Sequence, residues 1–267
     1  MSNYPPPQTD EAAAHHDYVN GHDPELGHGA HRSTVSQVRD PQFFKVANPG
    51  PLGLISFAIT TLCLGFYHLP GANPLGSVGP YQAIFGLAVF FGGGTQFVAG
   101  IMEFRVGNTF GSTLHCSYGA FWLSFAMFIV PSLGIREAYA GDERAFTVAV
   151  GIFLMAWCLL TLVFTIGALK TNIAILFVLG CLTLAFFFLG LAQFIAVPHP
   201  SAAIKVNQVG GAFSVFCALG ALYAGASGIM LPESTWVRFP LGEFNYAKPS
   251  PAAAAATENG ANGKQHA

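Results

Sequence analysis

The chain has 267 residues, of which 52% are apolar and only 9% are charged. A typical soluble domain carries about 25% charged residues, so eleven basic and thirteen acidic residues are too few to cover the surface of a soluble fold of this size. This composition excludes a soluble enzyme, a nucleic-acid-binding protein and a secreted disulfide scaffold.

The charged residues are unevenly distributed along the chain. Five stretches contain no Asp, Glu, Lys or Arg, and they cover residues 46–102, 106–135, 145–169, 171–204 and 206–232. Each stretch is longer than the ~20 apolar residues that cross a bilayer as a helix. The sequence therefore predicts an all-α, polytopic membrane protein.

Tails of different composition flank the apolar region. Residues 1–45 are rich in Pro, His, Asp and Ala without an apolar period, which predicts a disordered tail. Five histidines in this tail raise the alternative of a metal-binding segment, but their spacing is irregular, which favours a solvated tail: His15, His16, His22, His28 and His31. We expect one transmembrane domain over residues 46–232 and a second, largely disordered tail over residues 233–267.

Six predicted spans follow one another between the tails. In chain order they cover about residues 50–69, 80–103, 112–133, 145–169, 172–197 and 208–231. Pro80 suits the first turn of the second helix, and Pro198-His199-Pro200 closes the fifth span. The odd-numbered spans begin about every 60 residues, which suggests three hairpins around a central pathway.

The basic residues between the spans predict the orientation. With the N-terminus in the cytosol, seven basic residues lie on the cytosolic side: Arg32, Arg39, Lys45, Arg105, Lys170, Arg238 and Lys248. Three lie on the other side: Arg136, Arg144 and Lys205. Because cytosolic loops carry the excess of Lys and Arg, both termini are expected in the cytosol.

A Pro- and Gly-rich segment opens the first span: Asn48-Pro49-Gly50-Pro51-Leu52-Gly53-Leu54. Asn48 is a suitable N-cap for the first helix. Alternatively, the free N–H groups and partial positive charge of this helix start form a site for a small carboxylate. The residues alone favour the cap.

The connection between the second and third spans combines a carboxylate with a turn. Glu103 is attached to the apolar end of a span, and Gly107-Asn108-Thr109-Phe110-Gly111 follows it. Asn and Gly in this pattern are typical of a tight turn with left-handed backbone. Glu103 is equally compatible with an anchor that reaches water and with part of a polar site.

These motifs, with Ser117-Tyr118-Gly119-Ala120-Phe121-Trp122 in the third span, resemble the acetate uptake transporter family. The resemblance covers about residues 46–231 and departs from the family signature at Gly50, where Ala is usual. It implies a six-helix protomer within a homo-hexamer, and a pathway constricted by a Phe, a Tyr and a Leu. By their surrounding motifs these are Phe57, Tyr118 and Leu182, with Glu103, Asn108 and Thr109 near a polar mouth.

The positions of the three constriction residues agree with this implication. They lie 61 and 64 residues apart, one in each odd span. At 1.5 Å per residue they are roughly 10, 9 and 15 Å from the predicted helix starts, so they are able to surround one level of a pore. Without the resemblance, each would be assigned to core packing.

The sequence thus predicts a plasma-membrane permease for acetate and related short carboxylates, linked to protons and without metal or cofactor. Export of ammonium or ammonia is the alternative, since a pore for a small polar solute has the same sequence features. A membrane enzyme has no support, because no span holds paired carboxylates, an HExxH motif or a Ser/His/Asp set. His68 and His115 are the titratable groups expected nearest the pathway, and for His115 a hydrogen-bonded structural role is favoured over a proton relay.

Overall fold

The computed structural model describes residues 47–70 and 81–244. The tail histidines and Pro80 lie outside these residues. Within these ranges the protein is helical and contains no strand, only an isolated bridge between Asn172 and Glu243. Five helices are long and apolar enough to cross a membrane: α2 (Gly50–His68), the continuous helix Leu87–Arg105, α5 (Glu143–Gly167), α6 (Ile173–Ile195) and α7 (Pro200–Ile229).

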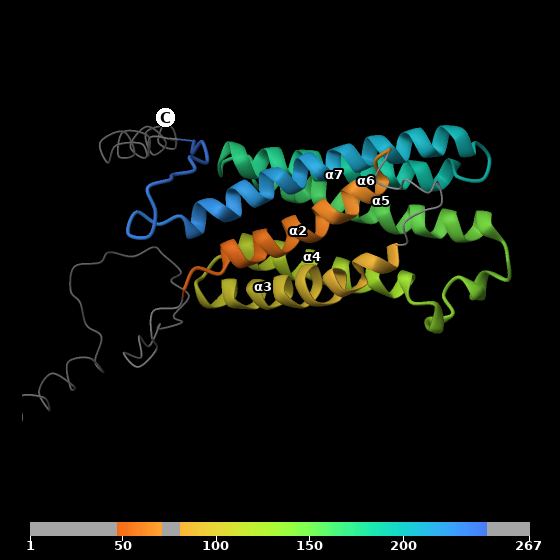
Figure 1. The fold of residues 1–267 in the computed structure, drawn as a ribbon, viewed down its shortest axis with the longest axis horizontal. Coiled ribbons are helices and arrows are strands. Elements are labelled where there is room, and N and C mark those ends of the chain that lie inside the picture. The colour runs from red at the N-terminus through yellow and green to blue at the C-terminus, as the bar shows by residue number, and fades with distance from the viewer. Residues whose placement is uncertain (1–46, 71–80, 245–267) are drawn as a thin grey trace, which may run out of the picture. The chain divides into compact units, whose positions relative to one another are not determined.

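Helix α4 (Thr109–Ile129) has 21 residues but lies outside this set of five. Its first half carries Ser112, Thr113, His115 and Ser117, which lower its mean hydropathy. The helix nevertheless runs beside the others as a member of the bundle (Figure 1). The prediction of an all-helical membrane fold is confirmed, and the structure adds that α4 is the most polar of the predicted spans.

The second predicted span is not one regular α-helix. It begins with a short 3₁₀ turn (Tyr81–Ile84), continues as a π-helix (Leu87–Thr95) and ends as α3 (Gln96–Arg105). Three consecutive glycines, Gly92 to Gly94, lie in the π-helical part, where Thr95 Oγ1 donates a 2.8 Å hydrogen bond to the Phe90 carbonyl. Segments of π-helix are frequent at functional sites, and this one directly precedes Gln96.

Helix α7 packs between α2 and α6 through small residues. A Cβ at Gly228 would lie 2.5 Å from Pro51 of α2, and a Cβ at Gly220 would lie 2.9 Å from Phe177 of α6. Small residues allow such close backbone approach between membrane helices. The helix starts at Pro200, eight residues before the predicted start, because Pro200 suits a first helical turn and the single charge of Lys205 does not interrupt a helix.

Helices α4 and α5 are joined in a different way. Their backbones do not pack closely; α4 packs on α3, and α5 packs on α6. Aromatic rings bridge the space between them, as in the stacked pair Phe121–Phe153 and the edge-to-face pair Phe128–Phe153. The third and fourth predicted spans, α4 and α5, are therefore held apart by side chains, which leaves room for a cavity beside α4.

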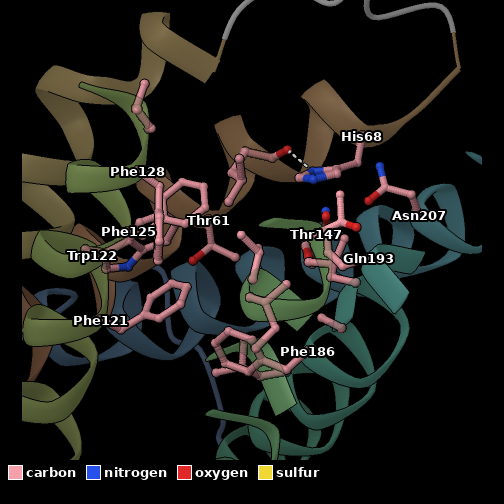
Figure 2. A pocket seen from close by; sticks show the side chains of 18 of the residues that line it. Thr61, His68, Phe121, Trp122, Phe125, Phe128, Thr147, Phe186, Gln193 and Asn207 are labelled. Carbon is pink, nitrogen blue, oxygen red and sulfur yellow. Dashed lines mark hydrogen bonds between the residues drawn. The ribbon is translucent and has the colours of Figure 1, made fainter. Parts of the chain in front are cut away.

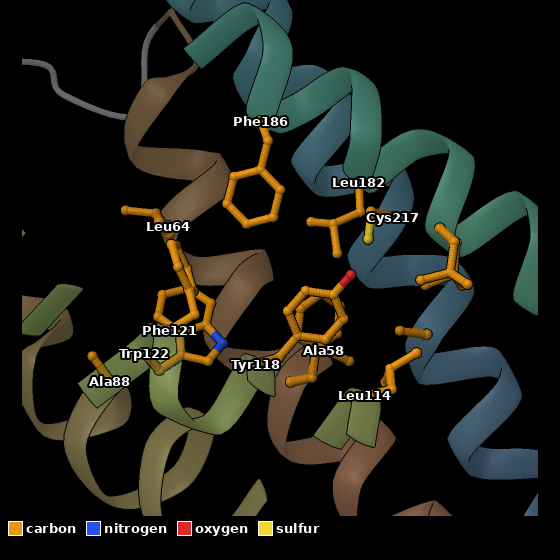
Figure 3. Packing of buried hydrophobic residues seen from close by; sticks show 14 of the residues in the cluster. Ala58, Leu64, Ala88, Leu114, Tyr118, Phe121, Trp122, Leu182, Phe186 and Cys217 are labelled. Atoms are coloured by element: carbon orange, nitrogen blue, oxygen red, sulfur yellow. The ribbon is translucent and has the colours of Figure 1, made fainter. Parts of the chain in front are cut away.

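The buried core gathers residues from α2, α4, α6 and α7 (Figure 3). Tyr118 and Leu182 lie near each other in this view, with Phe186 and Cys217 beside them.

The chain after α7 folds back onto the start of α6. The backbone N–H groups of Ile173 and Ala174 donate to the carbonyls of Gly242 and Leu241 at 3.0 and 3.1 Å. The Tyr223 hydroxyl of α7 donates to the Pro240 carbonyl at 2.9 Å. The segment 239–243 therefore satisfies two of the N–H groups that a helix start leaves unpaired.

Candidate functional site

The structure brings the three predicted constriction residues together. Phe57, Tyr118 and Leu182 are buried members of one cluster, and they follow the first residues of α2, α4 and α6 by seven, nine and nine positions. The rings of Phe57 and Tyr118 are 5.6 Å apart, centroid to centroid. The Tyr118 hydroxyl donates a 3.0 Å hydrogen bond to Thr161 Oγ1 of α5. We call these three residues the neck.

A cavity of about 370 Å³, the aromatic cavity, extends from the neck toward the C-terminal ends of α2, α4 and α6. Phe57 and Leu182 form its floor, and Thr61, Gln193 and Asn207 bring polar groups to its wall (Figure 2). Six aromatic side chains also line the wall: Phe121, Trp122, Phe125, Phe128, Phe146 and Phe186. The cavity fills the space that the aromatic spacing of α4 and α5 creates.

An ion pair lies at the outer end of the aromatic cavity. Arg136 donates to both carboxylate oxygens of Glu143 at 2.8 and 2.7 Å, and both side chains are more than half exposed. The Glu143 carboxylate raises the pKa of the Arg136 guanidinium, so this residue stays charged. Because exposed pairs stabilise a fold by only ~0.2–1 kcal/mol, this pair adds little stability and places two opposite charges at the cavity mouth.

A second cavity of about 300 Å³, the polar cavity, lies on the other side of the neck and shares Phe57 and Leu182 with the first. Its polar lining comes from Gln96, Glu103, Asn108, His115, Thr171 and Asn172. Among the described residues that line it, none is a lysine or an arginine. A carboxylate in this cavity would therefore find no cationic side chain in its lining.

The predicted polar mouth is organised around Glu103. This side chain is only 3% exposed, and its Oε2 accepts a 2.7 Å hydrogen bond from the Asn108 side chain. Asn108 also accepts from the Gly111 N–H at 2.9 Å, so it is the N-cap of α4. Thr109 is exposed and begins the helix. Glu103 is thus not an anchor that reaches water, because its side chain is buried. The predicted left-handed backbone applies to Gly107 (φ +78°) but not to Asn108 (φ −91°).

The motif at the start of α2 is partly buried. Asn48 is exposed and its Oδ1 accepts a 3.1 Å hydrogen bond from the Gly50 N–H. The prediction that Asn48 is the N-cap is wrong by one residue, because Pro49 occupies the N-cap position and no side chain caps the helix. Pro49, Pro51 and Gly53 are buried, Leu52 is exposed, and Leu54 lines the polar cavity with Gly50. The Glu103 carboxylate lies beside this helix start, 3.3 Å from a Cβ placed at Gly50, where the partial positive charge of the helix favours an anion.

The structure also shows buried polar side chains without partners, of which Thr61 and Gln96 were not indicated by the sequence and His115 was predicted to be hydrogen-bonded. Four buried side chains hold polar atoms without a hydrogen-bond partner among the described residues: Thr61 and Trp122 beside the aromatic cavity, and Gln96 and His115 beside the polar cavity. For Gln96 a signal existed, because an amide in the middle of an apolar span is costly unless it has a partner. No group of three metal-ligating side chains occurs in the part of the chain that the structure describes.

Two fungal proteins are similar to this chain in sequence. The chain is 35% identical over 193 residues to ammonia transport outward protein 2 of Saccharomyces cerevisiae (72% of this chain, 65% of that protein). It is 34% identical over 211 residues to acetate permease A of Emericella nidulans (76% and 68%). The match spans about two thirds of the length of each of these fungal relatives.

A bacterial relative is covered almost completely. The Escherichia coli succinate-acetate/proton symporter SatP is 32% identical over 200 residues, which are 74% of this chain and 97% of SatP. A solved structure of the bacterial acetate channel SatP superposes with a TM-score of 0.61 at 29% identity, over 74% of this chain and all of that chain. The profile of the GPR1/FUN34/yaaH family matches residues 31–245. Because this profile covers most of the chain and relatives above 30% identity match over two thirds or more of their length, this chain belongs to the GPR1/FUN34/yaaH family.

Proposed function

We propose that this protein transports acetate and related short carboxylates across a membrane, and that the substrate crosses between the two cavities at Phe57, Tyr118 and Leu182. The observation that carries this proposal is that the cavities lie on opposite sides of the neck and share Phe57 and Leu182. The names of the fungal acetate permease and of bacterial SatP support the substrate class.

The chemistry of the neck favours passage linked to a proton. A carboxylate that leaves water for an apolar passage loses hydration that only hydrogen-bond donors or cations could replace. At the neck, the one hydroxyl, that of Tyr118, already donates to Thr161. Passage as the neutral acid, or together with a proton, avoids most of this desolvation.

Two groups of residues are proposed to form the mouth of the polar cavity. The first is the start of α2, Asn48 to Leu54, whose turn brings Gly50 and Leu54 to the cavity. The second is Glu103 with Asn108 and Thr109, which fixes the neighbouring start of α4. These elements give the cavity a rigid polar rim.

We also propose six spans, with α4 as the sixth, both termini in the cytosol, a homo-hexameric assembly and a location in the plasma membrane. The distribution of basic residues supports the orientation, since Arg105 ends α3, Lys170 follows α5 and Arg238 follows α7, and these three helices would run toward the cytosol. The polar half of α4 lies against Glu103 and the polar cavity, which supports α4 as an interior span that needs less lipid-facing hydrophobicity.

The decisive experiment measures uptake of radiolabelled acetate by the purified protein in proteoliposomes. We expect uptake well above that of empty liposomes, and accumulation when the interior is more alkaline than the exterior. Uptake that equals the empty control would refute acetate transport. An uptake rate and a final acetate level that are the same with and without an imposed pH gradient would refute the proton link.

Ammonium is the second candidate cargo, because Glu103 places a carboxylate in a cavity whose described lining has no lysine or arginine. A yeast relative named for outward ammonia transport also matches this chain. Glu103→Gln separates the two cargoes: ammonium flux should fall strongly with the loss of the carboxylate, whereas passage of neutral acetic acid should persist. Ammonium flux that is absent in the parent protein would eliminate this candidate.

A further inference from the structure

We propose that Gln96 and His115 form a binding subsite for the carboxyl group of a short monocarboxylic acid within the polar cavity. This inference rests on the proposed transport of such acids and adds the residues that hold the acid before it reaches the neck.

The two side chains have unused hydrogen-bonding groups. Nε2 and Oε1 of Gln96 and Nδ1 of His115 have no hydrogen-bond partner among the described residues. Gln96 is 0% exposed and His115 is 4% exposed, and both line the polar cavity. Buried polar groups nearly always have a partner, so these atoms require one that enters the cavity.

The packing of α3 against α4 brings both residues to one place. Gly100, one turn after Gln96, allows α3 to approach α4 so closely that a Cβ there would lie 2.6 Å from the Cys116 backbone nitrogen. Residues four apart share a helix face, so Gln96 faces α4 as Gly100 does. On the opposite side, a Cβ at Gly53 would lie 2.6 Å from the His115 ring. The missing side chain of Gly53 therefore makes the space in which the imidazole lies.

The available groups match a neutral carboxylic acid. Such an acid offers one hydroxyl donor and one carbonyl acceptor, and the Gln96 amide offers the complementary acceptor and donor. His115 Nδ1 is able to donate or accept according to its tautomer. The acid's short carbon chain would face the apolar part of the wall, formed by Leu54, Val178 and Leu179. A bare carboxylate fits less well, because the described lining offers Glu103 and no lysine or arginine.

The test compares the concentration dependence of acetate uptake in proteoliposomes for Gln96→Leu, His115→Phe and the parent protein. Each substitution keeps the approximate volume and removes the hydrogen-bonding atoms. We expect the KM for acetate to rise about 5- to 10-fold in each variant, as for loss of one buried hydrogen bond to a ligand, while the maximal rate changes less than about 2-fold. His199→Phe is the matched histidine control, because His199 is exposed before α7 and lines neither cavity; its KM should equal that of the parent.

Gly53→Ala provides an independent test through packing. The added methyl group should displace the His115 ring and raise the KM on its own, but it should have little further effect in a His115→Ala background, where the space is free. Additive effects of the two changes would contradict the placement of the ring. Variants that lose the folded peak in size-exclusion chromatography are replaced by Gln96→Met and His115→Leu, which are judged by the same KM ratio.

A parent-like KM in folded Gln96 and His115 variants would overturn the subsite, while acetate transport itself would stand. A parent protein that neither takes up acetate nor binds it in detergent, by isothermal titration calorimetry, would instead overturn the proposed function. Restoration of the KM to within about 2-fold by His115→Gln, which returns a hydrogen-bonding group, would support direct contact with the acid.

Discussion

The aromatic cavity and the polar cavity meet at the same neck, yet they are built by opposite kinds of helix packing. Around the polar cavity, glycines bring α3 close to α4 and leave a space for His115 beside α2. Around the aromatic cavity, α4 and α5 are held apart by large rings such as Phe121, Phe153 and Trp157. Close packing thus creates a smaller chamber in which polar side chains are fixed near the neck, whereas wide spacing creates a larger vestibule in which aromatic rings lie near the neck and charged side chains lie at the outer end.

The difference in packing between the two cavities has a consequence for transport. Fixed polar groups select a substrate by hydrogen bonds, and an apolar passage penalises charge through desolvation. A substrate that moves between the cavities therefore leaves one partly polar lining, crosses the apolar neck and reaches a second partly polar lining. The predictions below alter one side while leaving the other as a reference, from the largest expected effect to the smallest.

The largest expected effect is on the close contact of α3 with α4. A Cβ at Gly119 would lie 2.8 Å from the Phe97 backbone nitrogen, which cannot move without the helix. Gly119→Ala should lower the free energy of unfolding by about 1–3 kcal/mol or more, as overpacking does. Thermal melting of the detergent-solubilised protein measures this effect. Gly180→Ala is the control, because nothing lies within 4 Å of a Cβ there, and it should be neutral or slightly stabilising.

The second prediction concerns the cap that supports the polar cavity. Asn108→Ala removes the N-cap of α4 and also the hydrogen bond to the buried Glu103, so a loss of about 2 kcal/mol is expected from the cap and the orphaned carboxylate together. Asp142→Ala removes only a cap, at the start of α5, and should lose about 1 kcal/mol. Equal melting temperatures of the two variants would contradict a structural link between Asn108 and Glu103.

The third prediction concerns the boundary between the cavities. Leu182→Ala enlarges the neck, so lactate and succinate uptake should increase by about tenfold relative to acetate, because small volume changes in apolar sites discriminate by this order. Leu182→Val is the milder variant if the alanine protein is unstable, since deletion of buried Leu atoms costs about 2–5 kcal/mol. An unchanged substrate profile in folded Leu182 and Phe57→Ala variants would remove the neck from the pathway.

The smallest effect is expected at the outer end of the aromatic cavity. Arg136→Gln breaks the exposed pair with Glu143 and should change the free energy of unfolding by less than about 1 kcal/mol. If Arg136 attracts acetate to the vestibule, the KM of the variant should be modestly higher than that of the parent protein at low salt. At high salt the two KM values should be equal, because salt screens exposed charges. A salt-independent defect would assign Arg136 a structural role.

Several features of the fold follow from the sequence alone. Long charge-free stretches determine that the chain is helical and membrane-embedded, because a bilayer admits helices whose backbone groups pair internally. The starts of α2, α5 and α6 were predicted within two residues, since caps and turn residues mark them locally. The family resemblance identified Phe57, Tyr118 and Leu182, and their distances from the predicted helix starts predicted that they share one level.

Other features depended on the tertiary structure. The sequence could not show that α4 and α5 stand apart, since the spacing arises from rings that meet across helices. It left the environment of Glu103 open, because burial of this carboxylate depends on the arrival of α2 and Asn108. It assigned His115 to a hydrogen-bonded structural role, whereas Nδ1 has no partner among the described residues. The local sequence pattern determined where the helices lie along the chain. The close packing at glycines and the ring contacts between helices determined where the cavities and the unpaired polar groups lie.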